Sequence, residues 1–240
     1  MDTYTSFAII ALAALIHASF QLSVSMLTLL GGHSLSRNVS RRRLLHLSSS
    51  FVVGTLVMTT LLLIMASYVS GTFARHGMSP FAWSIVSGLM MGLGVAVWLF
   101  YYRPGQGTAL WIPRGMSRFL SDRTKTTTSG TEAFSLGLVS GISELVFIAA
   151  SLVGAAFAII TLPSSFQLLG VALYVLISIA PLVTVYSLIS SGTQISRIQR
   201  WRESNKQFLQ YAAGSGLLIL GFFTFVNEAI AASVILRGGL

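Results

Sequence analysis

The sequence predicts an all-α integral membrane protein with six transmembrane helices, arranged as two inverted repeats of three, and with both termini external. Two observations predict the membrane class. Hydrophobic residues make up 54% of the 240-residue chain, charged residues only 9%, and the mean hydropathy is +0.79, which lies outside the range of soluble domains. The charged residues also cluster between long apolar runs, and about 20 apolar residues in a helix cross the hydrocarbon core.

Charged residues mark the limits of the expected helices. The first three runs hold no charged residue. The run from Glu132 to Arg197 holds only Glu144, and it is long enough for two crossings separated at "TLPSS". The last run holds only Glu228. The expected helices cover residues 5–30, 46–69, 81–102, 133–161, 166–190 and 208–234.

The whole chain, residues 1–240, is expected to form a single transmembrane domain. Repeat 1 covers about residues 1–102, a basic linker covers 103–132, and repeat 2 covers 133–240. The linker is too short to bury a core of its own. The N-terminus lacks the basic start and the cleavage site of a signal peptide, so we expect the first helix to be retained.

Basic residues are concentrated in the connections at 37–43, 103–132 and 191–207, whereas the other connections carry only Arg75. The positive-inside rule makes these three segments cytoplasmic and places the N- and C-termini outside. We therefore expect a multi-pass protein of the cell (plasma or inner) membrane. Its expected partners are the lipid bilayer and anionic lipid headgroups at the basic loops, and no nucleic acid.

The linker also contains an amphipathic segment, "GTALWIPRGMSRFLSDR". Its mixture of aromatic, apolar and charged residues predicts a short interfacial helix after Pro113, and a loop that binds a partner is the alternative. The chain has no cysteine, which excludes disulfides, thiol redox chemistry and thiolate metal ligands.

An internal repeat is indicated when the second half is placed over the first with a shift of 127 residues. "FAIIALAALIHASFQLSVSM" then lies over "FSLGLVSGISELVFIAASLV", which aligns Phe20 with Phe147 and His17 with Glu144. Shifts of 126 and 128 align the other two helices of each half. Because three helices is an odd number, the second copy is inverted. Inverted repeats of this kind are typical of transporters, whose substrate site lies near the bilayer midplane.

His17 and Glu144 each lie 11 or 12 residues into their expected helices, which is roughly 17 Å and near the bilayer middle. A carboxylate there costs at least ~2.5–3.5 kcal/mol on insertion scales. Glu144 must therefore face protein or water, be protonated or have a partner, and His17 is the natural candidate. A packing histidine held by hydrogen bonds is the alternative.

Polar residues extend this candidate site along both helices. Gln21, Ser25 and Thr28 follow His17 at helical spacing, and Ser140 precedes Glu144 by one turn. The candidate residues for substrate binding or proton coupling are His17, Gln21, Ser25, Ser140 and Glu144.

Three further residues are candidates for a gate or a kink. Pro181 removes a backbone hydrogen bond in the middle of the fifth expected helix. Asn227 and Glu228 lie near the outer end of the sixth helix, where snorkelling or capping is the simpler interpretation. The third and sixth helices are thinned by glycines, which we interpret as packing residues: Gly88, Gly92, Gly94, Gly214, Gly216 and Gly221.

Six helices, inverted repeats, external termini and one polar position at equal depth in helices one and four resemble the lysine-exporter (LysE) superfamily. This superfamily includes amino-acid exporters, MntP-type manganese exporters and CcdA-type membrane domains. The ending "FLQYAAGSGLLILGFFTF" is similar to its final helix. MntP-type proteins place an acidic residue before Ala-Phe in each repeat, where this chain has "IHASF" and "SELVF". The Pro-Gly-Pro element of amino-acid exporters and the CcdA cysteines are absent, so the resemblance implies a transporter without naming its substrate.

Three classes of function follow from the sequence. The first is a secondary transporter, an exporter of a small cation or small polar solute, with a midplane site from helices one and four. The second is a non-catalytic membrane scaffold whose buried polar residues fix helix packing. The third is a membrane redox protein, but a haem held by two histidines needs both at one depth, and only His17 lies deep.

No hydrolytic or redox motif occurs, so we expect no enzyme and no cofactor. His17 and Glu144 are the residues that could ligate a metal. Together with Gln21 and serines they would make a sparse, hard site, so a tightly held transition metal is not expected. Assembly into a homo-oligomer is left open.

Overall fold

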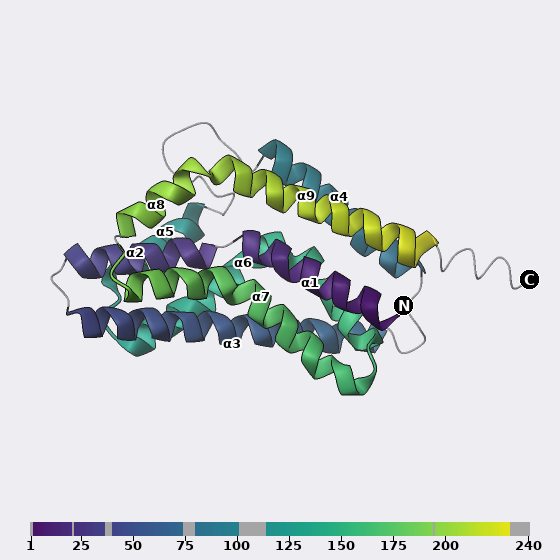
Figure 1. Cartoon of the computed structure of the whole chain (residues 1–240), viewed down its shortest axis with the longest axis horizontal. Helices are drawn as coiled ribbons and strands as arrows, with labels where there is room; N and C mark the ends of the chain where they lie inside the picture. Colours follow the sequence, from purple (N-terminus) through teal and green to yellow (C-terminus); the bar gives the residue numbers. More distant parts are fainter. Residues whose placement is uncertain are drawn as a thin grey trace, which may run out of the picture.

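A computed structural model describes residues 2–20, 22–36, 40–73, 80–100, 114–193 and 195–230, and within these ranges the chain is helical with short connections and no strand. Figure 1 shows most of the helices lying nearly along the long axis of an elongated bundle. The elements are α1 (Thr3–Ser19), α2 (Leu22–Ser36), α3 (Arg41–Phe73), α4 (Pro80–Phe100), α5 (Arg114–Thr126), α6 (Gly130–Thr161), α7 (Ser164–Ser190), α8 (Ile195–Ser204), α9 (Lys206–Thr224) and the π-helical η1 (Phe225–Ile230).

Five helices in the described part of the chain are long and apolar enough to cross a membrane, and there are six if the bent α6 is counted as one span. The five are Thr3–Gly31, Arg41–Thr72, Pro80–Leu99, Ser164–Ser190 and Gln207–Glu228. The predicted all-α class is thus confirmed, and five or six of the described helices are long and apolar enough to span a membrane. The last expected helix, 208–234, runs past Ile230, beyond which the structure is not described.

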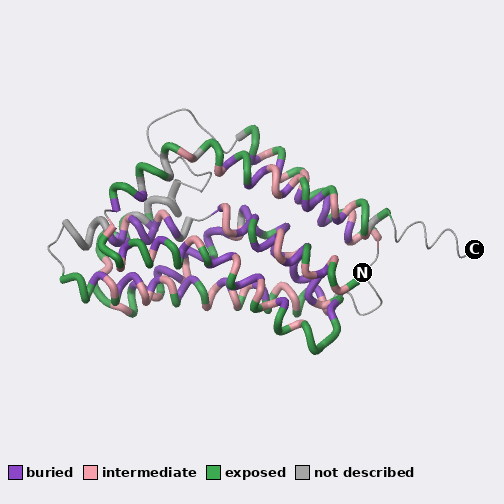
Figure 2. The backbone as a smooth tube through the Cα atoms, in the orientation of Figure 1, coloured by how far each residue is buried: buried purple, intermediate pink, exposed green. Residues whose placement is uncertain are grey.

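Apolar side chains also cover the outside of the bundle. Buried residues lie on the helix faces turned toward one another, and exposed residues lie on the outer faces (Figure 2). A soluble protein rarely exposes so much contiguous apolar surface, so this pattern is compatible with a multi-pass membrane protein. Large exposed apolar residues include Leu61, Ile64, Met65, Phe81, Leu168, Leu176 and Phe222.

The first and fourth expected spans are both interrupted near the bundle centre. α1 ends at Ser19, where the N–H of Phe20 donates to the carbonyl of His17 at 3.1 Å, and α2 begins at Leu22. α6 is assigned as one helix, yet its parts Gly130–Leu145 and Phe147–Thr161 are bent by 86°. No proline or glycine lies between residues 143 and 150, so the usual local causes of a sharp bend are absent.

Glycines bring two helix pairs into backbone contact. A methyl group at Gly54 would overlap the carbonyl oxygen of Phe134, and one at Gly137 would overlap that of Phe51, so α3 and α6 touch through their backbones. Between α4 and α9, a methyl group at Gly94 would lie 2.9 Å from the Gly214 carbonyl oxygen.

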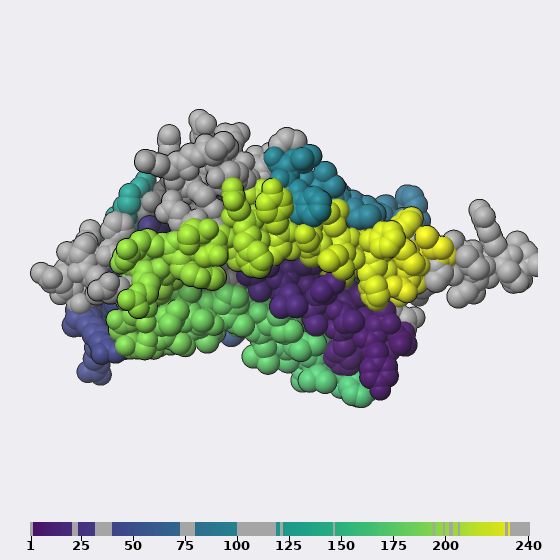
Figure 3. Space-filling model, turned by 45° about the horizontal axis from the view of Figure 1, so that its top comes forward, coloured from purple at the N-terminus to yellow at the C-terminus, as the bar shows by residue number. Residues whose placement is uncertain are grey.

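The other glycines predicted to pack give a mixed result. Methyl groups at Gly216 and Gly221 would meet Ile16 and the Ser87 carbonyl, both at 3.0 Å. Gly88 and Gly92 have open space instead. Figure 3 shows α9 running between α4 and α1 on one face of the molecule.

The described parts of the predicted basic connections lie at one end of the bundle (Figure 1). Arg41 at the start of α3 donates to the carbonyl of Ser190 at the end of α7, and Arg43 donates to the Thr128 carbonyl at 2.8 Å. The expected interfacial helix is α5, which begins directly after Pro113. A second short helix, α8, was not expected, and its buried Ile195 and Ile198 alternate with exposed arginines.

The start of α1 and the end of η1 lie at the opposite end of the bundle (Figure 1). Asp2 caps α1 because its carboxylate accepts the N–H of Thr5 at 3.0 Å. Hydrogen bonds from Thr5 hold the pKa of Asp2 below its usual value.

Candidate functional site

The two ionisable residues predicted to lie at mid-depth are in contact. His17 Nε2 lies 3.2 Å from Glu144 Oε2, and the two side chains are only 5% and 3% exposed. His17 lies fourteen residues after Thr3, and Glu144 lies fourteen residues after Gly130. This is roughly 21 Å along each helix. The pair therefore lies where α1 ends and α6 bends, at equal depth from the two helix starts.

The second ring nitrogen of His17 contacts Tyr174 on α7. Its hydroxyl lies 3.1 Å from His17 Nδ1, and Tyr174 is fully buried. Both ring nitrogens of His17 thus have a partner, which fixes the orientation of the ring. The sequence analysis missed Tyr174. The available signal was its position eight residues inside the expected helix 166–190, since aromatic residues of an interfacial belt lie near helix ends.

A second pair joins the same two interruptions. The rings of Phe20 and Phe147 are stacked, with centroids 5.6 Å apart and planes 9° apart. Each phenylalanine lies three residues after the ionisable residue of its own segment. Stacked aromatic rings stabilise a contact by more than the burial of their apolar area alone. This pair therefore holds the end of α1 against the bend in α6.

Hydroxyl groups line a small pocket beside the ion pair. Its volume is about 10 Å³, and the residues that line it are His17, Thr55, Thr59, Glu144, Ser178, Ile179 and Leu182. This is about the space that one water molecule or a small ion needs. Thr55 lies close enough to donate to the carbonyl of Phe51 at 3.1 Å or of Gly137 at 3.3 Å. The sequence analysis missed Thr55 and Thr59, whose four-residue spacing in an apolar run was the available signal.

The remaining candidates for substrate binding or proton coupling occupy different surroundings. Ser140 is buried one turn before Glu144 on α6. Ser25 is half-buried on α2, and its carbonyl accepts the hydroxyl of buried Thr28 at 2.8 Å. Gln21 lies outside the described residues. The expected polar stripe therefore crosses the break between α1 and α2 and does not follow one continuous helix face.

None of the three gate or kink candidates lines the small pocket beside His17 and Glu144. α7 continues through Pro181, although the next residue, Leu182, lines the small pocket. Asn227 is exposed and donates to the carbonyl of Phe223 at 3.0 Å. Glu228 is half-buried in η1. The sharp bend lies in α6 beside Glu144, at a position that no proline marks.

The chemistry of the site is that of a proton or a single small cation. It offers one carboxylate, one imidazole, one phenol and several hydroxyls. Among the described residues, no group of three histidine, cysteine or acidic side chains could hold a metal ion. Compared with protein-family models, curated proteins and solved structures, the chain matches none of them, so its similarity to the lysine-exporter superfamily rests on the sequence features alone.

Proposed function

We propose that this chain is a secondary transporter of the lysine-exporter type that exports a small cation in exchange for protons at the His17–Glu144 pair. The observation that carries the proposal is the buried contact of His17 with Glu144 at 3.2 Å, placed where α1 ends and α6 is bent. Ionisable residues inside a membrane are costly, and they commonly mark ion pathways and proton relays. Interrupted helices at mid-depth are likewise typical of transporter binding sites.

The proposed architecture is two inverted repeats related by an axis in the membrane plane. A two-fold axis of this kind relates each residue of one repeat to the equivalent residue of the other. Residues that lie on the axis therefore contact their own equivalents. His17 with Glu144 and Phe20 with Phe147 are two contacts of this kind, both separated by 127 residues. These two self-paired contacts support the alignment on which the repeat is based.

Antiparallel packing of equivalent helices also supports the inversion. Along α4 and α9, Ser87 contacts Thr224 at one end and Trp98 contacts Tyr211 at the other, so the two helices run in opposite directions. α1 and α6 do the same, because Ser6 lies 3.3 Å from Thr161 while His17 meets Glu144. Inversion requires this opposite direction for helices that contact each other across the axis.

Proton exchange follows from the hydrogen bonds of the pair. A neutral Glu144 with a neutral His17, or a carboxylate with an imidazolium, carries no net charge, and in both cases Nδ1–H donates to the Tyr174 hydroxyl oxygen. When one proton leaves, the proton that remains on the imidazole lies on Nε2 and is donated to the Glu144 carboxylate, so Nδ1 becomes an acceptor to which the Tyr174 hydroxyl can donate. The pair then has one net negative charge. A cation in the adjacent pocket would neutralise that charge. One proton is thereby exchanged for one positive charge.

Membrane orientation in this proposal follows the charges. The basic end of the bundle, with α5, α8 and the start of α3, lies on the cytoplasmic side of the cell membrane, and both termini lie outside. The pair then opens toward alternate sides as the two repeats move relative to each other.

A non-catalytic scaffold is the second candidate. The small size of the pocket favours it, since about 10 Å³ leaves no room for an organic solute. In that case the ion pair and its tyrosine only fix the packing of α1, α6 and α7.

Flux into sealed vesicles separates the two functions. The purified chain is reconstituted with a pH-sensitive dye inside, and gradients of K⁺, Na⁺, Mg²⁺ and Mn²⁺ are applied in turn. If the chain is a transporter, at least one of these cation gradients should drive proton movement faster than it does in protein-free vesicles. Equal rates for all four cations with and without protein would favour the scaffold.

A further inference from the structure

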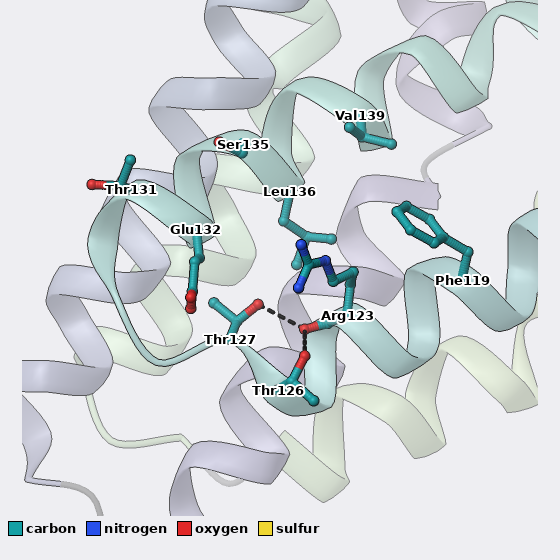
Figure 4. Close-up of a pocket in the computed structure, with 9 residues that line it drawn as sticks. All are labelled: Phe119, Arg123, Thr126, Thr127, Thr131, Glu132, Ser135, Leu136 and Val139. Atoms are coloured by element: carbon teal, nitrogen blue, oxygen red, sulfur yellow. Dashed lines mark hydrogen bonds between the residues drawn. The ribbon is translucent and has the colours of Figure 1, made fainter.

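A larger pocket lies at the basic end of the bundle, between α5 and α6. Its volume is about 270 Å³. α5 ends at Thr126 and α6 begins at Gly130, so the two helices diverge from a short turn and both contribute to the lining (Figure 4). The residues that line the pocket are Phe119, Arg123, Thr126, Thr127, Thr131, Glu132, Ser135, Leu136 and Val139.

The lining changes from polar to apolar with distance from the turn. Thr127 and Thr131 lie beside the turn, whereas Phe119 and Val139 lie at the far side of the pocket (Figure 4). α6 continues from Val139 into the apolar part of the bundle. The apolar end of the pocket thus points toward the expected hydrocarbon, and the polar end points toward the aqueous interface.

Arg123 is the one cation among the described residues of this lining, and its guanidinium lies beside Leu136 (Figure 4). No carboxylate of the described part of the chain forms a salt bridge with it. The nearby Glu132 accepts instead the N–H groups of Thr128 at 2.7 Å and Ser129 at 3.2 Å, as part of a capping box. The charges of Arg123 and Glu132 attract each other without forming a salt bridge, and within the described part of the chain the guanidinium N–H groups remain available to a ligand.

We propose that this pocket binds the headgroup phosphate of one anionic phospholipid, with Arg123 on the phosphate and the acyl chains leaving past Phe119 and Val139. A guanidinium matches the geometry of phosphate oxygens. The hydroxyls of Thr131 and Ser135 supply further donors, whereas those of Thr126 and Thr127 donate to the carbonyl of Arg123. The volume falls just below the ~300–1,000 Å³ typical of sites that enclose a whole ligand. A phospholipid needs no larger pocket, because only its headgroup enters and its acyl chains stay in the bilayer. The inference rests on the proposed membrane orientation and not on transport.

Lipid binding is measured by native mass spectrometry of the full chain in mild detergent. Phosphatidylglycerol and phosphatidylcholine with identical chains are added at equal concentrations. We expect one tightly held phosphatidylglycerol and weaker binding of phosphatidylcholine. Arg123→Gln should weaken phosphatidylglycerol binding about fivefold, the effect of ~1 kcal/mol per basic residue at an anionic surface. Arg123→Lys, which keeps the charge, should retain most of the binding.

Lys125→Gln is the matched control. Lys125 is exposed two residues further along α5, does not line the pocket and pairs with Asp122 at 3.8 Å. It should bind phosphatidylglycerol as the parent chain does, and Phe119→Ser should bind it more weakly with no change in charge. Equal binding by Arg123→Gln and the parent, or an equal loss in Lys125→Gln, would overturn the proposal. Displacement of the lipid by millimolar inorganic phosphate alone would show a soluble-phosphate site and overturn it as well.

Discussion

Phe20 and Phe147 stack with nearly parallel rings, three residues beyond His17 and Glu144 respectively, so the end of α1 and the bend in α6 meet at one point of the bundle. Four side chains from two distant segments thereby form one buried unit.

Removing one ring of the stack should destabilise the fold. Truncation of a buried phenylalanine costs about 3–5 kcal/mol in protein cores, so Phe147→Ala should clearly lower the melting temperature in detergent. Phe147→Leu keeps most of the volume and should lower it less. Phe222→Ala is the control, because Phe222 is an exposed residue of α9. An equal melting temperature for Phe147→Ala and Phe222→Ala would show that the stack contributes nothing.

Tyr174→Phe should alter the pair without unfolding the chain. The change removes only the hydroxyl that faces His17 Nδ1, and leaving a buried group without its partner costs about 1–3 kcal/mol. We expect a modest drop in melting temperature and a shifted pH dependence of proton flux. Tyr186→Phe, a half-buried tyrosine of the same helix, should change neither. If both variants behave alike, Tyr174 has no part in the site.

Replacing glycine by alanine should have opposite effects at two sets of positions. Gly54→Ala or Gly137→Ala would force a methyl group into a carbonyl oxygen of the facing helix, and such overpacking typically costs 1–3 kcal/mol. Gly88→Ala and Gly92→Ala meet open space and should be neutral or stabilising by about 0.5–1 kcal/mol. Thermal unfolding of the four variants measures this. A melting temperature that falls equally in all four would contradict the close approach of α3 and α6.

Labelling of introduced cysteines should report the orientation directly, since the native chain has none. With the basic end cytoplasmic, Ser40→Cys and Thr128→Cys should resist a membrane-impermeant thiol reagent added to intact cells. Ser165→Cys, in the exposed start of α7 at the other end, should react. Each thiol is checked for reactivity after lysis. Reaction at Ser40 or Thr128 in intact cells would reverse the proposed topology.

Hydropathy and charge were sufficient to predict the helical spans, and the depth of His17 and Glu144 indicated that they could meet. The face that each helix turns inward was harder to predict. Exposed residues such as Leu61 and Phe222 are as apolar as the core, so hydrophobic periodicity has little contrast in a membrane helix. The contact of Tyr174 with His17 depends on how α7 is rotated, and an apolar pattern does not encode that rotation.

The bend beside Glu144 was also missing from the prediction. Sharp bends are usually predicted from proline, and the sequence has one at Pro181, inside the helix α7, which changes direction along its length (Figure 1). The bend in α6 lies in a stretch without proline or glycine, where His17 and Phe20 of another segment contact α6. Contacts between residues 127 positions apart are tertiary information, which local sequence signals do not contain.

Proton flux in Glu144→Gln vesicles tests the central claim most directly. This variant keeps the size and hydrogen bonding of the side chain but loses the charge that holds the exchangeable proton, so cation-driven proton flux should vanish between about pH 5 and 8. Asp122→Asn, which removes an exposed carboxylate of α5, should leave the flux unchanged, and His17→Asn should shift its pH dependence with a smaller loss. Folded Glu144→Gln protein that exchanges protons at the parent rate across this range would contradict the account.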